Sequence, residues 1–193
     1  MVCISPFRSG SEPMMRLSIL AFLTSLAAMP AAAQVVSPDE APVRSADVMS
    51  TEYPNELAVD PYLRSNANAG AAPFQGTAMY QAFHGEAGVA RIVDGLVRRS
   101  VADPRLSGIF AASDLVRLRR TLKEQFCYIL GGGCEYSGRD MAAAHAQMGA
   151  QAADMGALVE NLQASMSEEG VPFATQNRFL AKLAPMKRDV VTR

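Results

Sequence analysis

Apolar residues recur at steps of three and four over residues 76–193, and this helical spacing is the feature that most constrains the fold. One stripe runs along residues 89–101. It should end at Asp103 and Pro104, because the residue before a proline disfavours helical geometry. Nothing in this part of the sequence alternates apolar and polar residues as a half-buried strand does. The pattern therefore predicts an all-α domain over residues 76–193.

Capping and helix-breaking residues mark the other helices. Asp114 is a good N-cap for a second long helix, and the three glycines at 131–133 should terminate it, because glycine tolerates the left-handed turn. Further helices are expected over residues 139–145, over about 152–167, and over a last segment that starts near Phe173 and kinks at Pro185.

Residues 1–33 are typical of a secretory signal peptide. Arg16 precedes a short apolar run over 17–29, and the small residues that follow form an A-x-A cleavage site. The run is shorter than the roughly 20 apolar residues of a permanent membrane span. We therefore expect cleavage after Ala33 and export, in a bacterium to the periplasm. An uncleaved anchor and an amphipathic first helix are the alternatives.

Residues 34–75 have the composition of a polar tether. Prolines recur along this segment, and two arginines stand against six acidic residues. Without apolar periodicity such a segment cannot offset the entropy lost on ordering. The composition predicts a disordered tether, with the part near Phe74 as a candidate for packing on the helical domain.

Charge and motifs exclude several function classes. The 18 basic and 19 acidic residues leave a net charge of −1, so no basic excess indicates a nucleic-acid partner. The sequence has no HExxH, GxSxG or paired CxxC motif, and no phosphate-binding glycine loop. The remaining chemical candidate is His145, one of two histidines, whose neutral imidazole is a suitable ligand for iron. The alternative is an ordinary surface or core histidine.

Three segments resemble the group I truncated haemoglobins. They are EAGVARIVDGLVRRSVADPRLSGIF (residues 86–110), LGGGCEYSGRDMAAAH (130–145) and GVPFATQNRFLAKLAPMKRDV (170–190). The second contains the family motif Y-x-G-x-x-M-x-x-x-H as Tyr136, Gly138, Met141 and His145. The resemblance covers the helical domain and neither the signal peptide nor the tether.

The resemblance implies a two-over-two helical sandwich around haem b. His145 matches the proximal iron ligand, Phe110 a residue that wedges against the porphyrin, and Met141 a residue at the haem edge, with Tyr136 also assigned to the cofactor site. The second ring nitrogen of His145 is expected to donate to a carbonyl one turn back, near Met141.

The positions that face bound ligand depart from the family pattern. Many members carry a tyrosine where this chain has Val97, and a glutamine on the second long helix where it has Leu122. The neighbouring distal position is Leu118. The resemblance thus implies an apolar distal pocket, formed by Val97, Phe110, Leu118, Leu122 and Phe126. Without hydrogen-bond donors such a pocket should hold dioxygen weakly and affect CO and NO less. A rotated helix would let Thr121 or Gln125 supply a donor.

These features favour a haem protein that reversibly binds a diatomic gas (oxygen, NO or CO), as in oxygen transport, with an unidentified electron donor. A haem redox enzyme acting on peroxide, nitrite or NO is the first alternative, although an apolar distal side is unfavourable for cleaving an O–O bond. A helical interaction module without haem is the second.

Each of three further features of the sequence has two possible interpretations. His84 is either a surface cap or a sixth iron ligand. The basic cluster Arg117, Arg119, Arg120 and Lys123 is either a solvated face or a partner for haem propionates. Cys127 and Cys134 either form a disulfide, which persists in an exported domain, or Cys127 is a buried free thiol.

The position of cleavage can be checked on exported protein. When the full chain is expressed in a bacterium, the mature protein should begin at Gln34. Mass spectrometry of the intact protein and of its N-terminal peptide measures this. A recovered chain that still contains residues 17–29 would instead support the uncleaved anchor.

Overall fold

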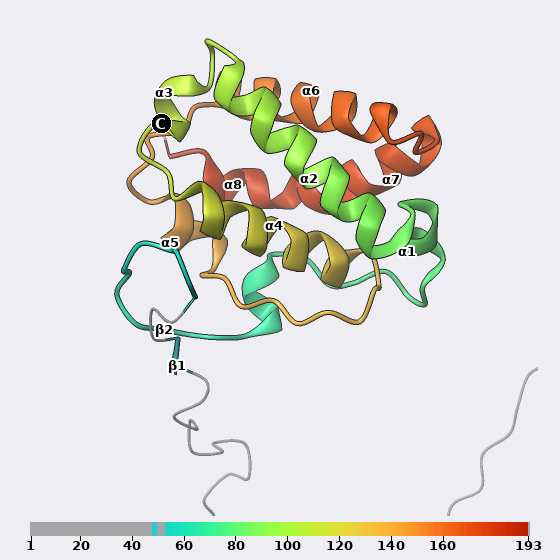
Figure 1. Ribbon diagram of the computed structural model, residues 1–193, viewed down its shortest axis with the longest axis horizontal. Helices are drawn as coiled ribbons and strands as arrows, with labels where there is room; N and C mark the ends of the chain where they lie inside the picture. The colour runs from blue at the N-terminus through green and yellow to red at the C-terminus, as the bar shows by residue number, and fades with distance from the viewer. Residues whose placement is uncertain (1–47, 50–52, 193) are drawn as a thin grey trace, which may run out of the picture. The chain divides into compact units, whose positions relative to one another are not determined.

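A computed structural model describes residues 48–49 and 53–192 of this chain (Figure 1). The described residues all belong to one compact unit, Pro42–Arg193. The predicted signal peptide, residues 1–33, lies outside the described residues, as do residues 34–47 and 50–52 of the predicted tether.

Helices dominate the described part of the chain. The α-helices are α1 (Ala78–Ala82), α2 (Gly85–Ala102), α3 (Ser107–Phe110), α4 (Leu115–Ile129), α5 (Met141–His145), α6 (Ala152–Glu168), α7 (Phe173–Leu183) and α8 (Lys187–Val190). Two 3-10 helices, η2 (Asn66–Ala69) and η3 (Ala184–Met186), and two short strands, β1 (Val48–Met49) and β2 (Tyr62–Leu63), complete the set. No helix formed by these described residues is long and apolar enough to cross a membrane.

Local chemistry explains where the long helices begin and end. The Asp114 side chain accepts hydrogen bonds from the backbone N–H groups of Val116 and Arg117, both at 3.0 Å, which caps α4 as expected. Asp103 has extended backbone geometry and ends α2 before Pro104. Pro185 lies in η3, where the last helix changes pitch between α7 and α8. The regular α-helix is thus interrupted at the proline, where the sequence predicted a kink.

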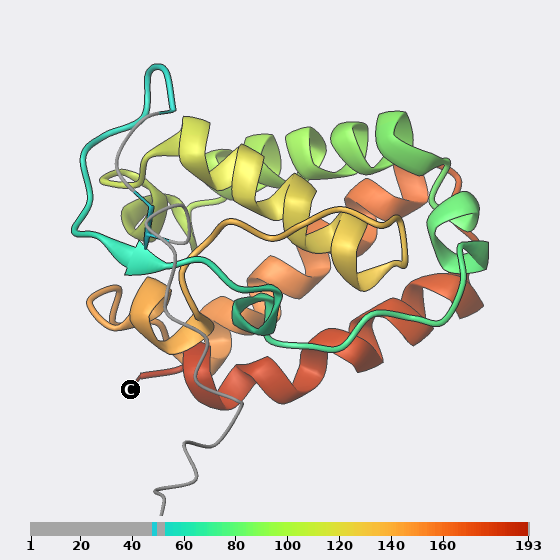
Figure 2. The same cartoon turned by 90° about the horizontal axis from the view of Figure 1, so that it is seen from below.

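The long helices pack as two pairs. Helix α2 packs against α4 and also against α6, and α6 packs against α7. Figure 2 shows α2 and α4 along one side of the domain, with α7 and α8 along the other. This arrangement confirms the predicted all-α, two-over-two sandwich. Phe83, Phe126 and Phe179 join the two sides, with edge-to-face ring contacts at centroid distances of 5.1 and 5.0 Å.

Residues 53–75, which we call the N-terminal strap, correct one expectation. The composition predicted disorder here, but the strap packs on the helical domain, and Ala69 is fully buried. The Phe74 N–H donates to the carbonyl of Ile129 at 2.8 Å, so the end of the strap near Phe74 is also held. The difference has a physical cause: hydrogen bonds and ion pairs to distant residues order the strap, and composition does not reveal such contacts. Strand β2 of the strap pairs antiparallel with β1, which precedes the strap.

A buried carboxylate joins the start of α2 to the end of α6. Glu169, whose side chain is 10% exposed, accepts hydrogen bonds from Arg91 Nε at 2.8 Å and Arg91 Nη2 at 2.6 Å. His84 Nδ1 lies 2.9 Å from the same carboxylate, and half of the His84 side chain is exposed. The surface-cap interpretation of His84 thus agrees with its position. Hydrogen bonding to Arg91, opposed by burial, lowers the pKa of Glu169 to about 2.

This lowered pKa predicts loss of stability in acid. The folded protein takes up the Glu169 proton near pH 2, whereas the unfolded chain takes it up near the ordinary pKa of 4.5. The contribution is thus complete above pH 4.5 and is lost as the pH falls towards 2. Urea unfolding at pH 5 and pH 3 should show a larger fall in the free energy of unfolding for wild type than for Glu169→Gln. Equal falls would contradict the assignment.

Candidate functional site

The short helix α5 presents the histidine singled out by the sequence. The side chain of Asp140 accepts a hydrogen bond from the backbone N–H of Ala143 at 2.9 Å and so caps the helix. Met141 follows with only 9% of its surface exposed, and His145 ends the helix half-buried. The cap and the buried methionine therefore set where His145 lies.

One hydrogen bond determines which nitrogen of His145 is available. Nδ1 lies 2.7 Å from the carbonyl oxygen of Met141. A carbonyl oxygen only accepts hydrogen bonds, so Nδ1 carries a proton, and in the neutral form of the ring Nε2 has the lone pair. The expected bond from the second ring nitrogen is confirmed. A neutral imidazole in this tautomer is a metal ligand with a fixed ring orientation.

His145 offers a single imidazole as a metal ligand. Over residues 48–49 and 53–192, no group of three or more His, Cys, Asp or Glu side chains is arranged to hold a metal ion. Iron in a macrocycle can be held by one imidazole of this kind, since the ring supplies four nitrogens and the protein one further ligand.

Most of the predicted cofactor-site residues lie in one apolar core. Val97 on α2 and Phe126 on α4 are 1% and 3% exposed. Tyr136 and Met141 belong to the same cluster, and the half-buried Leu118 and Leu122 pack against it. Phe110 on α3 is half-buried and lies outside this cluster, as does His145. Contact of these eight residues with a cofactor stays a prediction.

Thr121 and Gln125, the two side chains considered as hydrogen-bond donors to a bound gas, donate to backbone carbonyls instead. Thr121 Oγ1 donates to the carbonyl of Arg117 at 3.0 Å within its own helix. Gln125 is buried, and its Nε2 donates to the carbonyl of Ala69 in the strap at 2.9 Å and to Met141 Sδ at 3.4 Å. Neither donor is therefore free, and the side of the core formed by Val97 and the leucines of α4 remains apolar.

All four cations of the basic cluster form ion pairs within the protein. Arg117 and Arg120 bind Glu56 of the strap, while Arg119 and Lys123 lie within 3.6 and 3.1 Å of Asp94. The solvated-face interpretation is therefore wrong for Arg117 and Arg120, whose side chains are less than one-fifth exposed. Sequence patterns did not indicate their partner Glu56, which precedes Arg120 by 64 positions.

The two cysteines of the helical domain are joined. Cys127, near the end of α4, and Cys134, beyond the glycine turn, form a disulfide with a Cα–Cα distance of 5.7 Å. Of the two interpretations left open, the structure has the bridge. It closes the turn that leads from α4 towards Tyr136, and so limits where the connection to α5 can go.

The packing of the Tyr136 ring explains why a glycine follows two positions later, at Gly138. Tyr136 is 5% exposed, and its hydroxyl donates to the carbonyl of Arg139 at 3.1 Å. Burial raises the pKa of this tyrosine. A Cβ atom added at Gly138 would lie 2.2 Å from the Tyr136 hydroxyl oxygen. Only glycine lets the ring lie across the backbone here, just before α5.

Comparison with known proteins identifies similar chains. Residues 78–192 match the family model described as bacterial-like globin. The group 1 truncated hemoglobin GlbN of Mycolicibacterium paratuberculosis is 28% identical over 114 residues, covering 59% of this chain and 84% of the relative. The group 1 truncated hemoglobin GlbN of Nostoc commune is 27% identical over 115 residues, covering 60% and 98%.

Solved structures show the same likeness. The truncated hemoglobin from Tetrahymena pyriformis in its Fe(III) form superposes with a TM-score of 0.57 at 26% identity, covering 60% of this chain and 98% of that one. The 2/2 hemoglobin from Synechococcus sp. PCC 7002, in the cyanomet state with covalently attached heme, gives a TM-score of 0.55 at 25% identity, with coverages of 60% and 98%. Both matches leave two-fifths of this chain uncovered.

The packing of Tyr136 on Gly138 can be tested with two glycine variants. Gly138→Ala should lower the free energy of unfolding by about 1–3 kcal/mol, because the tyrosine ring must move. Gly156→Ala is the control: an added Cβ meets nothing within 4 Å in α6, so this variant should gain about 0.5–1 kcal/mol. Urea unfolding measures both, and equal stabilities would contradict the packing argument.

Proposed function

The chain belongs to the bacterial-like globin family and is a truncated globin, and on this basis we propose that it holds haem b through His145 and reversibly binds a diatomic gas. The observation that carries the proposal is the 2.7 Å contact between His145 Nδ1 and the Met141 carbonyl. It leaves the Nε2 lone pair free in a ring that cannot easily turn. When bound, the haem supplies the iron at which the gas is held.

The chain's own residues would act on the two faces of the site. On the proximal side, the Met141 carbonyl holds the proton of Nδ1, which orients the ring and raises the basicity of Nε2. On the opposite side, we assign Val97, Leu118 and Leu122 to the surface nearest the gas, with Phe110 and Phe126 beside them. These side chains exclude water and offer no hydrogen-bond donor. Such a surface supports CO or NO binding better than tight storage of dioxygen.

The same apolar surface weighs against peroxidase chemistry, which uses polar distal groups to cleave an O–O bond. We infer a gas-binding protein rather than an enzyme. Ferrous iron would be maintained by an electron donor that nothing in the chain identifies. The signal-like residues 1–33 further lead us to propose that the protein works outside the cytoplasm, in the periplasm of a bacterium.

The two histidines provide the test and its control. Purified wild type reconstituted with haem should show a Soret band at one haem per chain, which shifts on reduction and addition of CO. His145→Ala should lose stoichiometric haem, because the imidazole that would hold the iron is gone. His84→Ala should keep the wild-type spectrum, because that imidazole pairs with Glu169 at the surface. Absorption titrations measure all three proteins.

The proposal fails if wild type takes up no stoichiometric haem, in which case a helical interaction module becomes the better explanation. It also fails if the spectrum of His145→Ala is unchanged. A six-coordinate ferrous spectrum that is lost in His84→Ala would instead make His84 a second ligand.

A further inference from the structure

We propose that the N-terminal strap is a working part of the haem site, because it holds the connection between α4 and α5 and thereby positions the helix that carries His145. The strap, residues 53–75, lies outside the part of the chain that matches the globin family, residues 78–192. The proposal rests on the proposed haem function, and it assigns Glu56 and Tyr62 as positioning residues for that site.

The strap is first attached to α4 through a buried carboxylate. The side chain of Glu56 is 3% exposed. Its oxygens lie 2.6 and 2.9 Å from Arg120 Nε and Nη2, and 3.1 Å from Arg117 Nε. Burying a carboxylate is costly unless it is paired and hydrogen-bonded, and these two guanidinium groups provide both. The bonds to Arg120 lower the pKa of Glu56, which keeps it ionised.

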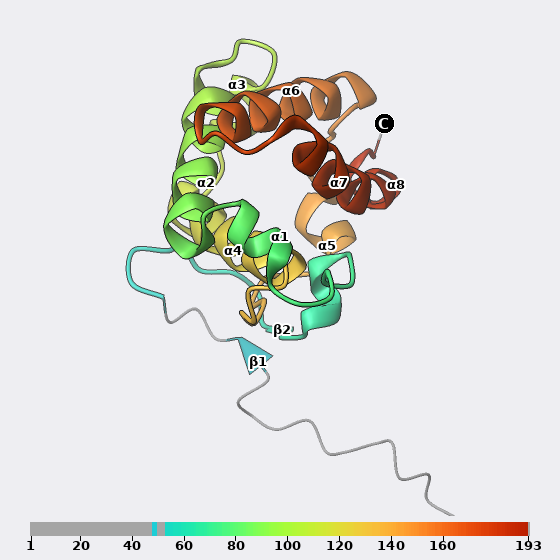
Figure 3. The same ribbon diagram turned by 90° about the vertical axis from the view of Figure 1, so that its right-hand side faces the viewer.

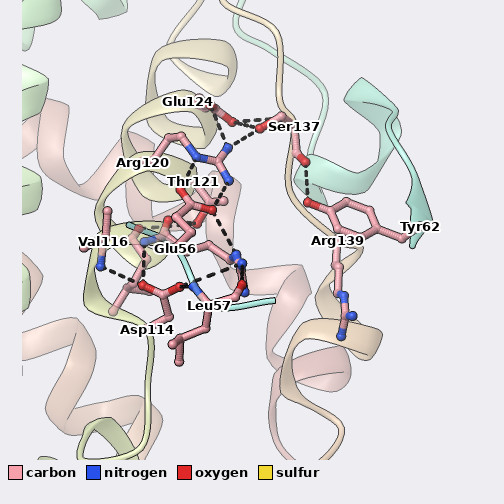
Figure 4. A network of polar contacts seen from close by, with 12 residues as sticks. Glu56, Leu57, Tyr62, Asp114, Val116, Arg120, Thr121, Glu124, Ser137 and Arg139 are labelled. Carbon is pink, nitrogen blue, oxygen red and sulfur yellow. Dashed lines mark hydrogen bonds and ion pairs between the residues drawn. The ribbon is translucent and has the colours of Figure 1, made fainter. Parts of the chain in front are cut away.

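Arg120 passes this attachment on to the α4–α5 connection, the chain between Ile129 and Met141. Its Nη1 donates to Glu124 Oε1 at 3.0 Å and also to the hydroxyl of Ser137. The backbone N–H and the hydroxyl of Ser137 in turn donate to Glu124 Oε2 at 2.9 and 2.5 Å. Figure 4 shows this network, with Glu56 and Arg120 on one side and Ser137 on the other. A residue of the strap is thus linked to the connection through two side chains of α4.

The strap also holds the connection directly. Each of the four consecutive residues 136–139 forms a hydrogen bond with the strap. The connection donates twice, from Tyr136 N to Asn66 Oδ1 at 2.8 Å and from Arg139 Nη2 to the Asp60 carbonyl at 3.1 Å. It accepts twice, at the Ser137 carbonyl from Tyr62 Oη at 2.7 Å and at the Gly138 carbonyl from Asn68 Nδ2 at 3.2 Å. Three of these bonds fix backbone groups, so they restrain the path of the chain and not only its side chains.

The restrained residues lead immediately into α5. Asp140, the cap of α5, follows Arg139 directly, and His145 lies at the end of that five-residue helix. Figure 3 shows η2 of the strap beside α5. A Cβ atom added at Gly70, which follows η2 with φ of 80°, would lie 3.0 Å from Cγ of Met141. The strap therefore also packs against the first residue of α5.

The length of α5 explains why such a restraint matters. A helix of five residues has too few internal hydrogen bonds to be stable by itself, so its position depends on what holds its ends. The strap holds residues 136–139, which lead into the N-terminal end of α5. If that hold is weakened, the Met141 carbonyl and the His145 ring move together relative to α2 and α4, and the bond to iron weakens.

Two variants of the full chain and one matched control test this. Glu56→Gln removes the charge that binds Arg117 and Arg120, and Tyr62→Phe removes only the hydroxyl that binds Ser137. The control is Glu169→Gln, which also removes a buried carboxylate held by an arginine, but joins α2 to the end of α6 instead of touching the strap. It measures the effect of losing comparable stability elsewhere.

The first readout is the rate at which haem passes to an excess of apomyoglobin. Loss of a group that supports a metal ligand typically weakens metal binding by 10-fold or more, so Glu56→Gln should release haem about tenfold faster than wild type. Tyr62→Phe should release it faster by a smaller factor, and Glu169→Gln should release it at the wild-type rate. The iron–histidine stretching band of the reduced protein should shift in the two strap variants and not in the control.

The second readout needs no haem. In the apoprotein, the amides of residues 136–145 should exchange hydrogen faster in both strap variants than in Glu169→Gln. If haem release or this exchange in the strap variants equals that of the control, the proposal is wrong while haem binding at His145 stands. If wild type binds no haem, the haem function and this role for the strap both fail, and the exchange data then show only whether the strap restrains α5.

Discussion

The hydrogen bond between His145 Nδ1 and the Met141 carbonyl is the contact on which the functional interpretation depends. It exists because both residues lie on one face of α5, four positions apart, where the carbonyl of the first meets the ring of the second. The bond fixes the tautomer, and the tautomer leaves Nε2 able to bind iron. A metal bound to a single protein side chain needs that side chain to be held accurately, because no second ligand corrects its position.

Several contacts along the chain that leads into α5 hold this helix in place. The disulfide between Cys127 and Cys134 fixes the turn after α4, and Tyr136 packs across Gly138 just before α5. Glu56 makes a longer connection by joining the strap to α4, whereas the Glu169 pair joins α2 to the end of α6 and stabilises another part of the domain. Removing one partner of such a pair leaves an uncompensated buried charge, so losing either partner is costly.

Much of the fold was predictable because its signals are local. Asp114 caps α4 with its own side chain, Pro104 ends α2, and Pro185 disrupts the last helix, each through neighbouring residues. The bond from His145 to Met141 was also predictable, since four residues make one helical turn. The arginines of α4 were not: their partner Glu56 lies 64 positions away from Arg120, in a segment whose composition indicates disorder. The same holds for Gln125, whose partner is the Ala69 carbonyl.

By itself, the sequence determined the helical periodicity, the ends of the helices and the spacing that sets His145 one turn after Met141. These follow from backbone geometry and from contacts within a few residues. Only the tertiary structure decided that residues 53–75 belong to the domain, that Arg117 and Arg120 face inward to Glu56, and that Gln125 is not free to act as a donor. These outcomes depend on which distant groups meet when the helices pack, and burial then requires each charge and amide to find a partner.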